Sequence, residues 1–301
     1  MVRLAHLSDL HATQVPWLGP ADFAGKRLLG WLSWRARRRK IHRVEVLEAL
    51  LRDLPSTAAD HIVVTGDLTN LACEHEFHQA RAWLERLGPP ERVSIVPGNH
   101  DAYVSMPRGR SWDRWSAYLD SDEGAAPGGF PTLRVRGSLA LVGVCSAMPS
   151  APLLATGRLG EEQLEQLDKL LAGLAESPLC RVLLIHHPIT DGATSRRRAL
   201  TDAAELRGVL ARSGADLVLH GHGHRTLFGE IPGPHGPIPV VGVRSSSDIG
   251  HKPHKRAQYH LYEIEPRASA GGGGARFRIT TRIRGYDPVG GCFSGEGERV
   301  L

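Results

Sequence analysis

Side chains of the types that bind metal ions occur in five short segments of the chain. They are four histidines, two aspartates and one asparagine: Asp9, His11, Asp67, Asn99, His186, His222 and His224. A ligand set that mixes imidazole with carboxylate favours Mn, Fe, Co or Zn over the all-oxygen sites of Mg or Ca. Two such ions about 3.5–4 Å apart can deprotonate a water between them and hold the phosphoryl oxygens of a substrate. The residue types therefore predict a site for two divalent or trivalent ions that hydrolyses phosphoesters.

The spacing of these residues indicates how they share the ions. Asp9 and His11 are two positions apart. On an extended strand their side chains would share one face, so we expect them to bind one ion together. His222 and His224 have the same spacing, and Asp67 offers a carboxylate able to bridge two ions.

Each ligand-bearing segment follows a short apolar run, which predicts that each lies at the end of a strand. The predicted strands span residues 4–7, 62–64, 93–96, 182–185 and 217–219. Helical spacing of apolar residues predicts helices over 44–54, 74–87, 161–174 and from a cap at Asp202 to about residue 213. The alternation indicates an α/β fold, in which functional loops follow the carboxyl ends of strands.

The last third of the chain changes to a β pattern. Strands are predicted over 238–243, 259–264 and 277–283, with a flexible turn at 271–274; an earlier hairpin is predicted over 133–135 and 139–144. The tail after Gly285 is rich in glycine and is expected to be irregular. We therefore expect one domain over 1–285, with an insertion at 12–43, and a tail over 286–301.

The five segments, taken in order, resemble the signature of the calcineurin-like metallophosphoesterase superfamily. They are Asp9-Leu10-His11, Gly66-Asp67, Gly98-Asn99-His100-Asp101, His186-His187-Pro188 and Gly221-His222-Gly223-His224. The resemblance implies a four-layer α-β-β-α sandwich and a metal-bridging hydroxide as the nucleophile. It implies that the first ion is bound by Asp9, His11 and His224. It implies that the second is bound by Asn99, His186 and His222, with Asp67 as the bridge.

The resemblance also implies catalytic roles for two further residues. His100 would contact the phosphoryl group and help the leaving oxygen depart, and Asp101 would orient the His100 ring. Two features differ from Ser/Thr protein phosphatases: residues 66–70 read Gly-Asp-Leu-Thr-Asn, and Asp101 stands where those enzymes carry Glu. Both agree better with small bacterial-type phosphodiesterases, including the class III cyclic-nucleotide type. Asn70 itself is interpreted as a residue that stabilises the turn.

Composition and cysteine usage bound the cellular setting. The chain has 301 residues, of which 41% are hydrophobic and 23% charged, as in an ordinary globular protein. Its four cysteines form no close pair, which suits a reducing compartment. No apolar run reaches the length of about 18 residues that spans a membrane, and the N-terminus lacks the pattern of a signal peptide. We therefore expect a cytoplasmic protein.

The insertion is the most individual part of the sequence. It contains eight basic residues and no acid between Lys26 and Arg43, and without them the net charge of +5 would be negative. Three interpretations remain open: an amphipathic helix packed on the domain, a segment over 17–40 that contacts anionic membrane lipids, or a lid over the active site. Nucleic acid is not expected as a partner, because no recognised nucleic-acid module accompanies the basic run.

Nine of the remaining histidines divide into three groups. Five are expected on the surface or in packing: His6, His42, His61, His75 and His78. His187 and His220 adjoin ligand positions and are interpreted either as supports of the ligands or as structural residues. His251 and His254 lie in a polar segment that either lines a substrate pocket or is an ordinary loop.

Two alternatives to a soluble phosphodiesterase stay open. One is a lipid-linked pyrophosphate or phosphodiester hydrolase that works at the membrane surface. The other is a non-catalytic metal-binding scaffold, although every ligand position and His100 are filled. The sequence leaves the substrate, the native metals and the oligomeric state open.

Overall fold

The computed structural model describes residues 1–11, 13–15, 25–107, 109–125, 129–267 and 276–301. The strands are β1 (Val2–Leu7), β2 (His61–Val64), β3 (Val93–Ile95), β4 (Thr132–Arg136), β5 (Leu139–Gly143), β6 (Cys180–Leu184), β7 (Leu217–His220), β8 (Leu227–Ile231), β9 (Ile238–Gly242), β10 (Gln258–Pro266), β11 (Phe277–Asp287) and β12 (Cys292–Val300). The helices are α1 (Lys26–Ser33), α2 (Arg39–Ile41), α3 (Val44–Asp53), α4 (Glu74–Leu87), α5 (Ser116–Leu119), α6 (Glu161–Gly173) and α7 (Ala203–Ser213). Shorter turns are the π-helical η2 (Trp34–Arg38) and the 3-10 turns η3 (Leu54–Thr57), η4 (Trp112–Trp115), η5 (Arg196–Arg198) and η6 (Pro253–Lys255).

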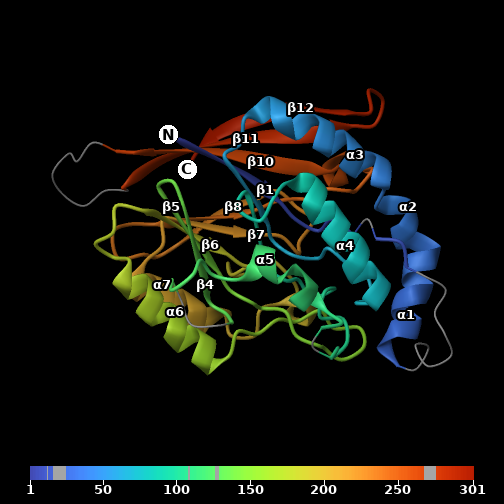
Figure 1. Cartoon of the computed structure of the whole chain (residues 1–301), viewed down its shortest axis with the longest axis horizontal. Coiled ribbons are helices and arrows are strands. Elements are labelled where there is room, and N and C mark those ends of the chain that lie inside the picture. Colours follow the sequence, from blue (N-terminus) through green and yellow to red (C-terminus); the bar gives the residue numbers. More distant parts are fainter. Residues whose placement is uncertain (12, 16–24, 108, 126–128, 268–275) are drawn as a thin grey trace.

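The strands form two six-stranded sheets packed face to face. The first has the order β12-β11-β10-β1-β2-β3 and the second the order β4-β5-β6-β7-β9-β8. Leu4 and Val63 of the first sheet share a buried cluster with Leu141 and Val182 of the second. Helices α3 and α4 cover the outer face of the first sheet, and α6 and α7 cover that of the second (Figure 1). The predicted four-layer α-β-β-α sandwich is confirmed.

Both sheets contain a run of parallel strands that are buried on both faces: on one side of the first sheet and in the middle of the second. Strand β1 runs parallel to β2, which runs parallel to β3. Strands β5, β6, β7 and β9 run parallel to one another in the second sheet. The carboxyl ends of these strands therefore meet at one edge, where the loops that follow them come together.

Helix α4 shows how local sequence sets one element. Its buried residues Phe77, Ala80 and Leu84 recur at helical spacing and face the core. At its start, the Glu76 side chain accepts from the Cys73 backbone N–H in a capping box. Its end is fixed by Gly88, so the predicted helix over 74–87 is confirmed at both ends.

Three expectations about elements are wrong. The tail is not irregular: β12 pairs antiparallel with β11 and forms the edge of the first sheet. Strand β8 was not foreseen, because Gly229 and Glu230 interrupt its apolar pattern. Asp202 precedes α7, but its carboxylate accepts from the backbone N–H groups of Leu159 and Gly160 rather than capping the helix.

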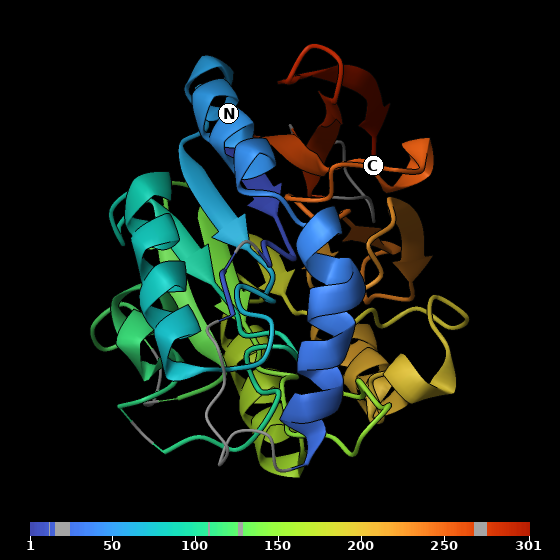
Figure 2. The same cartoon turned by 90° about the vertical axis from the view of Figure 1, so that its right-hand side faces the viewer.

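The insertion forms a helical segment over 26–41, made of α1, η2 and α2, at one end of the sandwich (Figure 2). Trp34 anchors it in a buried cluster with Val15 and Leu71. Gly30 permits this close approach, because a Cβ there would lie 2.5 Å from Leu71 Cδ2 and 2.5 Å from Tyr103 Oη. Residues 16–24, with Trp17, Leu18 and Phe23, lie outside the described residues, as does the turn expected at 271–274.

Candidate metal centre

The structure brings the seven predicted ligands to the loops that follow β1, β2, β3, β6 and β7. Asp9 and His11 come after the end of β1, with positive φ angles of 52° and 45°. They do not lie on an extended strand, so the expected reason for their shared orientation is wrong. Five of the eight non-glycine residues described with positive φ are predicted ligands: Asp9, His11, Asp67, His222 and His224. Such backbone strain concentrates at functional sites, where the surrounding fold holds it.

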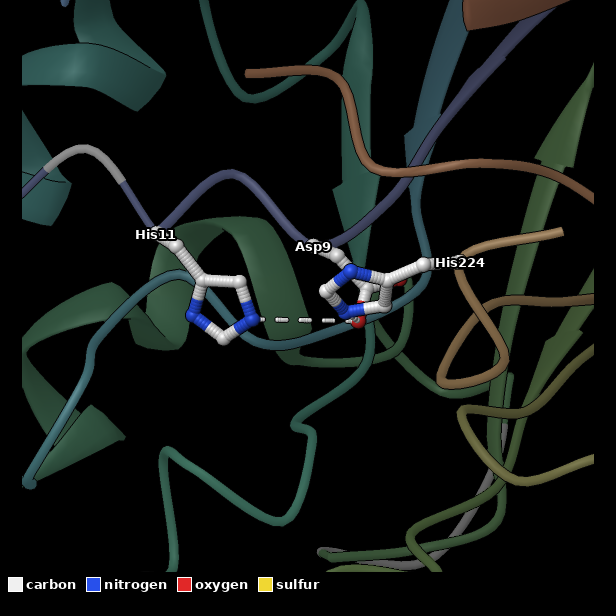
Figure 3. A group of neighbouring side chains, drawn as sticks. All are labelled: Asp9, His11 and His224. Atoms are coloured by element: carbon white, nitrogen blue, oxygen red, sulfur yellow. Dashed lines mark ion pairs between the residues drawn. The ribbon is translucent and has the colours of Figure 1, made fainter. Parts of the chain in front are cut away.

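Asp9, His11 and His224 form the first group (Figure 3). Asp9 Oδ1 lies 3.0 Å from His224 Nε2 and 3.9 Å from His11 Nε2. The Asp9 and His11 side chains are almost fully buried, and that of His224 is 23% exposed. This group therefore opens toward solvent on the side of His224.

Asn99, His186 and His222 form the second group. The Asn99 Oδ1 atom lies 3.1 Å from His186 Nε2 and 2.8 Å from His222 Nδ1. The two histidine nitrogens are 3.2 Å apart. All three side chains are buried, so these atoms converge on one enclosed point.

Asp67 lies between the two groups. Its Oδ2 atom is 3.6 Å from His11 Nε2 and 3.3 Å from His186 Nε2. Its other oxygen, Oδ1, accepts a hydrogen bond of 2.7 Å from the His100 backbone N–H. A single carboxylate oxygen therefore faces both groups, as a bridging ligand must.

Backbone carbonyls fix the tautomers of three histidines. His11 Nδ1 lies 2.9 Å from Thr69 O, and His186 Nδ1 lies 2.6 Å from Thr65 O. His222 uses its other nitrogen, with Nε2 2.9 Å from Arg198 O. Because a carbonyl only accepts, each of these nitrogens donates and the second ring nitrogen keeps a lone pair for the centre.

The donor atoms fit two metal ions. Atoms that share an ion at about 2.0–2.2 Å must lie roughly 3–4 Å from one another, and the separations of 3.0 to 3.9 Å in the first group meet this condition. Asp9 Oδ1 is also buried without a hydrogen-bond donor. A buried carboxylate oxygen in this state is costly unless a cation pairs with it.

The protonation of the ligands also fits metal binding. Burial lowers the pKa of His11 to about 4, so its ring is neutral at pH 7. Burial also disfavours the charged form of His186, but Asp67 outweighs it and raises the pKa to about 9. An ion that binds between Asp67 and His186 would release this proton.

His100 lies beside the two groups with its ring held by the turn after β2. His100 Nδ1 donates a hydrogen bond of 2.6 Å to Asn70 O. Its ring stacks on Tyr103 at 5.6 Å between centroids and meets His11 edge-on at 4.9 Å. Asn70 in turn donates to His11 O at 3.0 Å, which agrees with its interpretation as a turn-stabilising residue.

Asp101 does not hold the His100 ring, contrary to the expectation from the resemblance. Its carboxylate accepts at 2.9 Å from each of the backbone N–H groups of Asp67, Thr69 and Gly98. Burial raises the pKa of Asp101 to about 7, with Asp67 adding to the effect. Asp101 therefore shapes the loops that carry Asp67 and Asn99, and the ring of His100 is held by Asn70.

Sequence patterns gave no sign of two residues at this site. Arg38, from the π-helical turn η2, places Nη1 3.1 Å from His100 Nδ1 and donates from Nη2 to Gly30 O at 3.1 Å. His42 is a buried packing residue, as one of the two expected roles, but its ring lies 4.6 Å from that of His11 and 5.6 Å from that of His224 and so contacts the metal-binding groups. Both lie in the basic insertion, and only its position after His11 pointed to them.

The other histidines lie as follows. His187 packs its ring 4.4 Å from that of His222, which gives it a supporting position. His6, His61 and His220 are buried among strands, and His75 and His78 are exposed on α4. His251 and His254 line a cavity beside the metal-binding groups.

The chain is similar to known proteins over most of its length. A profile of the calcineurin-like phosphoesterase family matches residues 2–226. A probable cyclic nucleotide phosphodiesterase from a Synechococcus strain is 28% identical over 226 residues, which cover 73% of this chain and 78% of that protein.

Two solved structures share the fold at low sequence identity. A dimetal phosphatase from Danio rerio has a TM-score of 0.62 and 13% identity, with 98% of each chain covered. A purple acid phosphatase from yellow lupin has a TM-score of 0.53 and 13% identity, covering 99% of this chain and 53% of that one.

Proposed function

This chain belongs to the calcineurin-like phosphoesterase family, and we propose that it is a two-metal phosphodiesterase. The observation that carries the proposal is the position of Asp67 Oδ2, which is 3.6 Å from His11 Nε2 and 3.3 Å from His186 Nε2. A carboxylate oxygen between two groups of ligands fits a bridge between two ions better than a ligand of one ion. A non-catalytic scaffold is disfavoured, because no ligand position is vacant and His100 accompanies them.

Two ions held by these residues would supply a hydroxide nucleophile at neutral pH and would neutralise charge on the phosphoryl oxygens. The protein's own residues position the rest of the reaction. His100 has its Nδ1 proton committed to Asn70 O, so Nε2 is the ring nitrogen that faces an incoming phosphoryl group. We assign His100, protonated at Nε2 when the anionic phosphoryl group is bound, to donate to the phosphoryl oxygens and to the leaving oxygen.

Arg38 adds a positive charge at the same place. Its Nη2 donates to Gly30 O at 3.1 Å, and its Nη1 lies beside the His100 ring, 3.1 Å from Nδ1 and 3.4 Å from Nε2. Burial, with Arg38 among the neighbouring charges, keeps the pKa of His100 well below its usual range. Arg38 therefore positions His100 and adds to the attraction for anionic phosphoryl oxygens.

A diester substrate is supported by the loop after β2. Residues 66–70 and Asp101 differ from the Ser/Thr protein phosphatase pattern, and the relative from Synechococcus is named as a probable cyclic nucleotide phosphodiesterase. The test is the Mn-supplemented rate on bis-p-nitrophenyl phosphate against p-nitrophenyl phosphate, with chelated enzyme as the control. We expect a metal-dependent preference for the diester; a preference for the monoester would make the protein a phosphatase instead.

Cyclic nucleotides are the first natural substrates to test. We expect metal-dependent conversion of a 3′,5′-cyclic nucleotide to the 5′- or 3′-monophosphate. Chromatography of the products measures this conversion. Turnover of bis-p-nitrophenyl phosphate without any turnover of cyclic nucleotides would keep the diesterase and remove this substrate. The four cysteines are free of disulfides in the structure, which supports the proposed cytoplasmic location.

Helix α1 supports a second candidate, in which the same chemistry acts on a lipid at the membrane surface. Leu28, Leu29 and Leu32 are 36%, 50% and 49% exposed on its outer face, and the basic residues of 35–40 follow in the same helical segment. Exposed leucines beside basic residues suit the surface of an anionic membrane. Among the described helices, none is both long and apolar enough to cross a membrane.

The membrane candidate is tested by sedimentation with vesicles of phosphatidylglycerol and phosphatidylcholine. We expect the protein to pellet with anionic vesicles and to stay in solution when Leu29→Ser and Leu32→Ser are combined. Val289→Ser is the matched control, because Val289 is 94% exposed in the turn between β11 and β12. A protein that stays in solution with every vesicle would remove the membrane candidate and leave the diesterase proposal intact.

A further inference from the structure

A cavity of about 640 Å³ opens beside the first group of metal ligands, and we call it the basic cavity. Its walls come from the helical segment over 26–41, from η5 and from the loop over 248–255. His224, the exposed member of the first group, lies in its wall. A volume of this size accepts a small molecule and not a folded macromolecule.

The cavity gathers more positive charge than one phosphodiester requires. Six basic side chains line it: Arg37, Arg38, Lys40, Arg198, Lys252 and Lys255. Asp248 is the single carboxylate among the described lining residues. A diester carries one negative charge, which the metal centre already neutralises, so these cations suit a further anionic group.

Three of the basic side chains have no described counter-charge. No ion pair or side-chain hydrogen bond is described for Arg37, Lys40 or Lys252 among the residues that the structure describes. Arg38 Nε is buried without a hydrogen-bond partner. Like charges brought together without counter-charges repel one another, and an anion bound among them would remove this repulsion.

Three of the cations connect the cavity directly to the metal centre. Arg198 Nη2 donates to His222 O at 2.7 Å, and Lys255 Nζ lies 3.4 Å from His224 O. Arg38 lies at the opposite wall with its Nη1 on His100. An anion in the cavity therefore lies within the reach of one small substrate whose phosphodiester is at the metal ions.

We propose that the basic cavity binds a second phosphate group of the substrate, separate from the phosphodiester that is cleaved. The inference rests on the proposed function, because it assumes a diester at the metal centre. Phosphate is favoured because a terminal phosphate carries close to two negative charges and offers three acceptor oxygens, which match several Arg and Lys donors. The substrate class is thus a phosphodiester that also carries a terminal phosphate.

The first experiment compares two pairs of substrates that differ only in a phosphate. One pair is the p-nitrophenyl ester of thymidine 5′-phosphate, with and without a 3′-phosphate. The other is short-chain phosphatidylinositol, with and without a 4-phosphate. In the pair that resembles the natural substrate, we expect the added phosphate to raise kcat/KM by at least about tenfold, the scale of one charge-assisted contact.

The two pairs distinguish a nucleotide from a lipid as the source. A gain confined to the thymidine pair assigns a phosphorylated nucleotide, and a gain confined to the lipid pair assigns a phosphorylated headgroup. If the plain diesters are hydrolysed and neither gains from the added phosphate, the inference is overturned while the proposed function stands.

Variants locate the effect in the cavity. Combining Arg37→Ser with Lys252→Ser should abolish the gain from the added phosphate and leave the rate on the plain diester within about twofold. Arg39→Ser is the matched control, because Arg39 is exposed in the same helical segment but does not line the cavity. A gain that survives in the double variant would overturn the inference.

Binding to the chelated protein gives a readout that needs no turnover. By calorimetry, thymidine 3′,5′-bisphosphate should bind at least about tenfold more tightly than thymidine 5′-monophosphate, and the double variant should bind both alike. If no substrate is hydrolysed, the proposed function fails, and this measurement still decides the inference. Equal binding of the two nucleotides to the native chain, together with no lipid preference, would overturn it.

Discussion

The metal-binding groups and the basic cavity share a wall but are built in opposite ways. The ligands of the metal centre are almost all buried, and three of the histidines are fixed by backbone carbonyls. The cavity is lined by long basic side chains, of which Arg37, Lys40 and Lys252 are exposed. A reaction on phosphorus needs fixed atoms, whereas recognition of a variable substrate tolerates side chains that adjust. The comparison therefore separates the chemistry from the selectivity.

Arg38 belongs to both regions. It lines the cavity, yet its Nη2 donates to Gly30 O and its Nη1 lies 3.1 Å from His100 Nδ1. It reaches this place through the π-helical turn η2, a type of distortion that is frequent at functional sites. Substitutions in the metal centre and substitutions in the basic cavity should thus change kcat and KM differently.

The largest effect is expected for Asp67→Ala in the metal centre. Because one carboxylate faces both groups, its loss should remove both ions and lower kcat/KM by at least about a thousandfold. Metal content by mass spectrometry and the rate on bis-p-nitrophenyl phosphate measure this. Asp191→Ala, at an exposed aspartate, is the control. A variant that retained two ions would contradict the bridging role.

The next largest effect is expected for His100→Ala. His100 belongs to neither the first nor the second group of ligands, although its ring also lies close to His11 and Asp67, so we expect metal content to be retained. The rate should fall by at least about a hundredfold, as on removal of a general acid. His75→Ala, exposed on α4, is the matched histidine control. Near-full activity with two ions present would remove His100 from the mechanism.

Residues that directly follow strands could be placed at the site from the sequence, whereas the partners of a residue within a loop could not. Asp67 and Asn99 were predictable, because a carboxylate or amide directly after a buried strand has few structural uses. Asp101 was misassigned because its letters fit a ring-orienting role, whereas its carboxylate binds three backbone N–H groups. Which partner a buried carboxylate finds depends on loop geometry that no local pattern encodes.

In the insertion, too, the sequence predicted the type of element but not which of its residues face the site. Its helical character and basic charge were predictable, and Trp34 packs on the domain as the first interpretation expects. Arg38 also contacts His100, while the lid and the membrane contact stay predictions. The inward face carries Arg27, Gly30 and Arg38, while leucines face outward. Hydrophobic patterning would have assigned the opposite orientation, because it assumes that apolar residues face the core.

A smaller effect is expected for Arg38→Met, which separates the two regions. Loss of the charge beside His100 should lower kcat on bis-p-nitrophenyl phosphate by about tenfold, the scale of one charge-assisted hydrogen bond. KM for this plain diester should change by less than about twofold, because the metal ions bind it. Arg37→Met should leave kcat unchanged. Equal effects of the two substitutions on kcat would show that Arg38 acts only as part of the cavity.

The smallest effect is expected for Gly30→Ala, which should shift the helical segment that carries Arg38 between the two regions. The new Cβ would lie 2.5 Å from Leu71 Cδ2 and from Tyr103 Oη, so the helical segment must move outward. Because Arg38 donates to Gly30 O at 3.1 Å, this movement should displace the guanidinium and lower kcat by about threefold, less than its removal. Gly173→Ala is the control, since a Cβ there meets nothing within 4 Å. If Gly30→Ala keeps the native kcat although thermal unfolding shows the packing strain, the helix does not set the position of Arg38, and the two regions are independent.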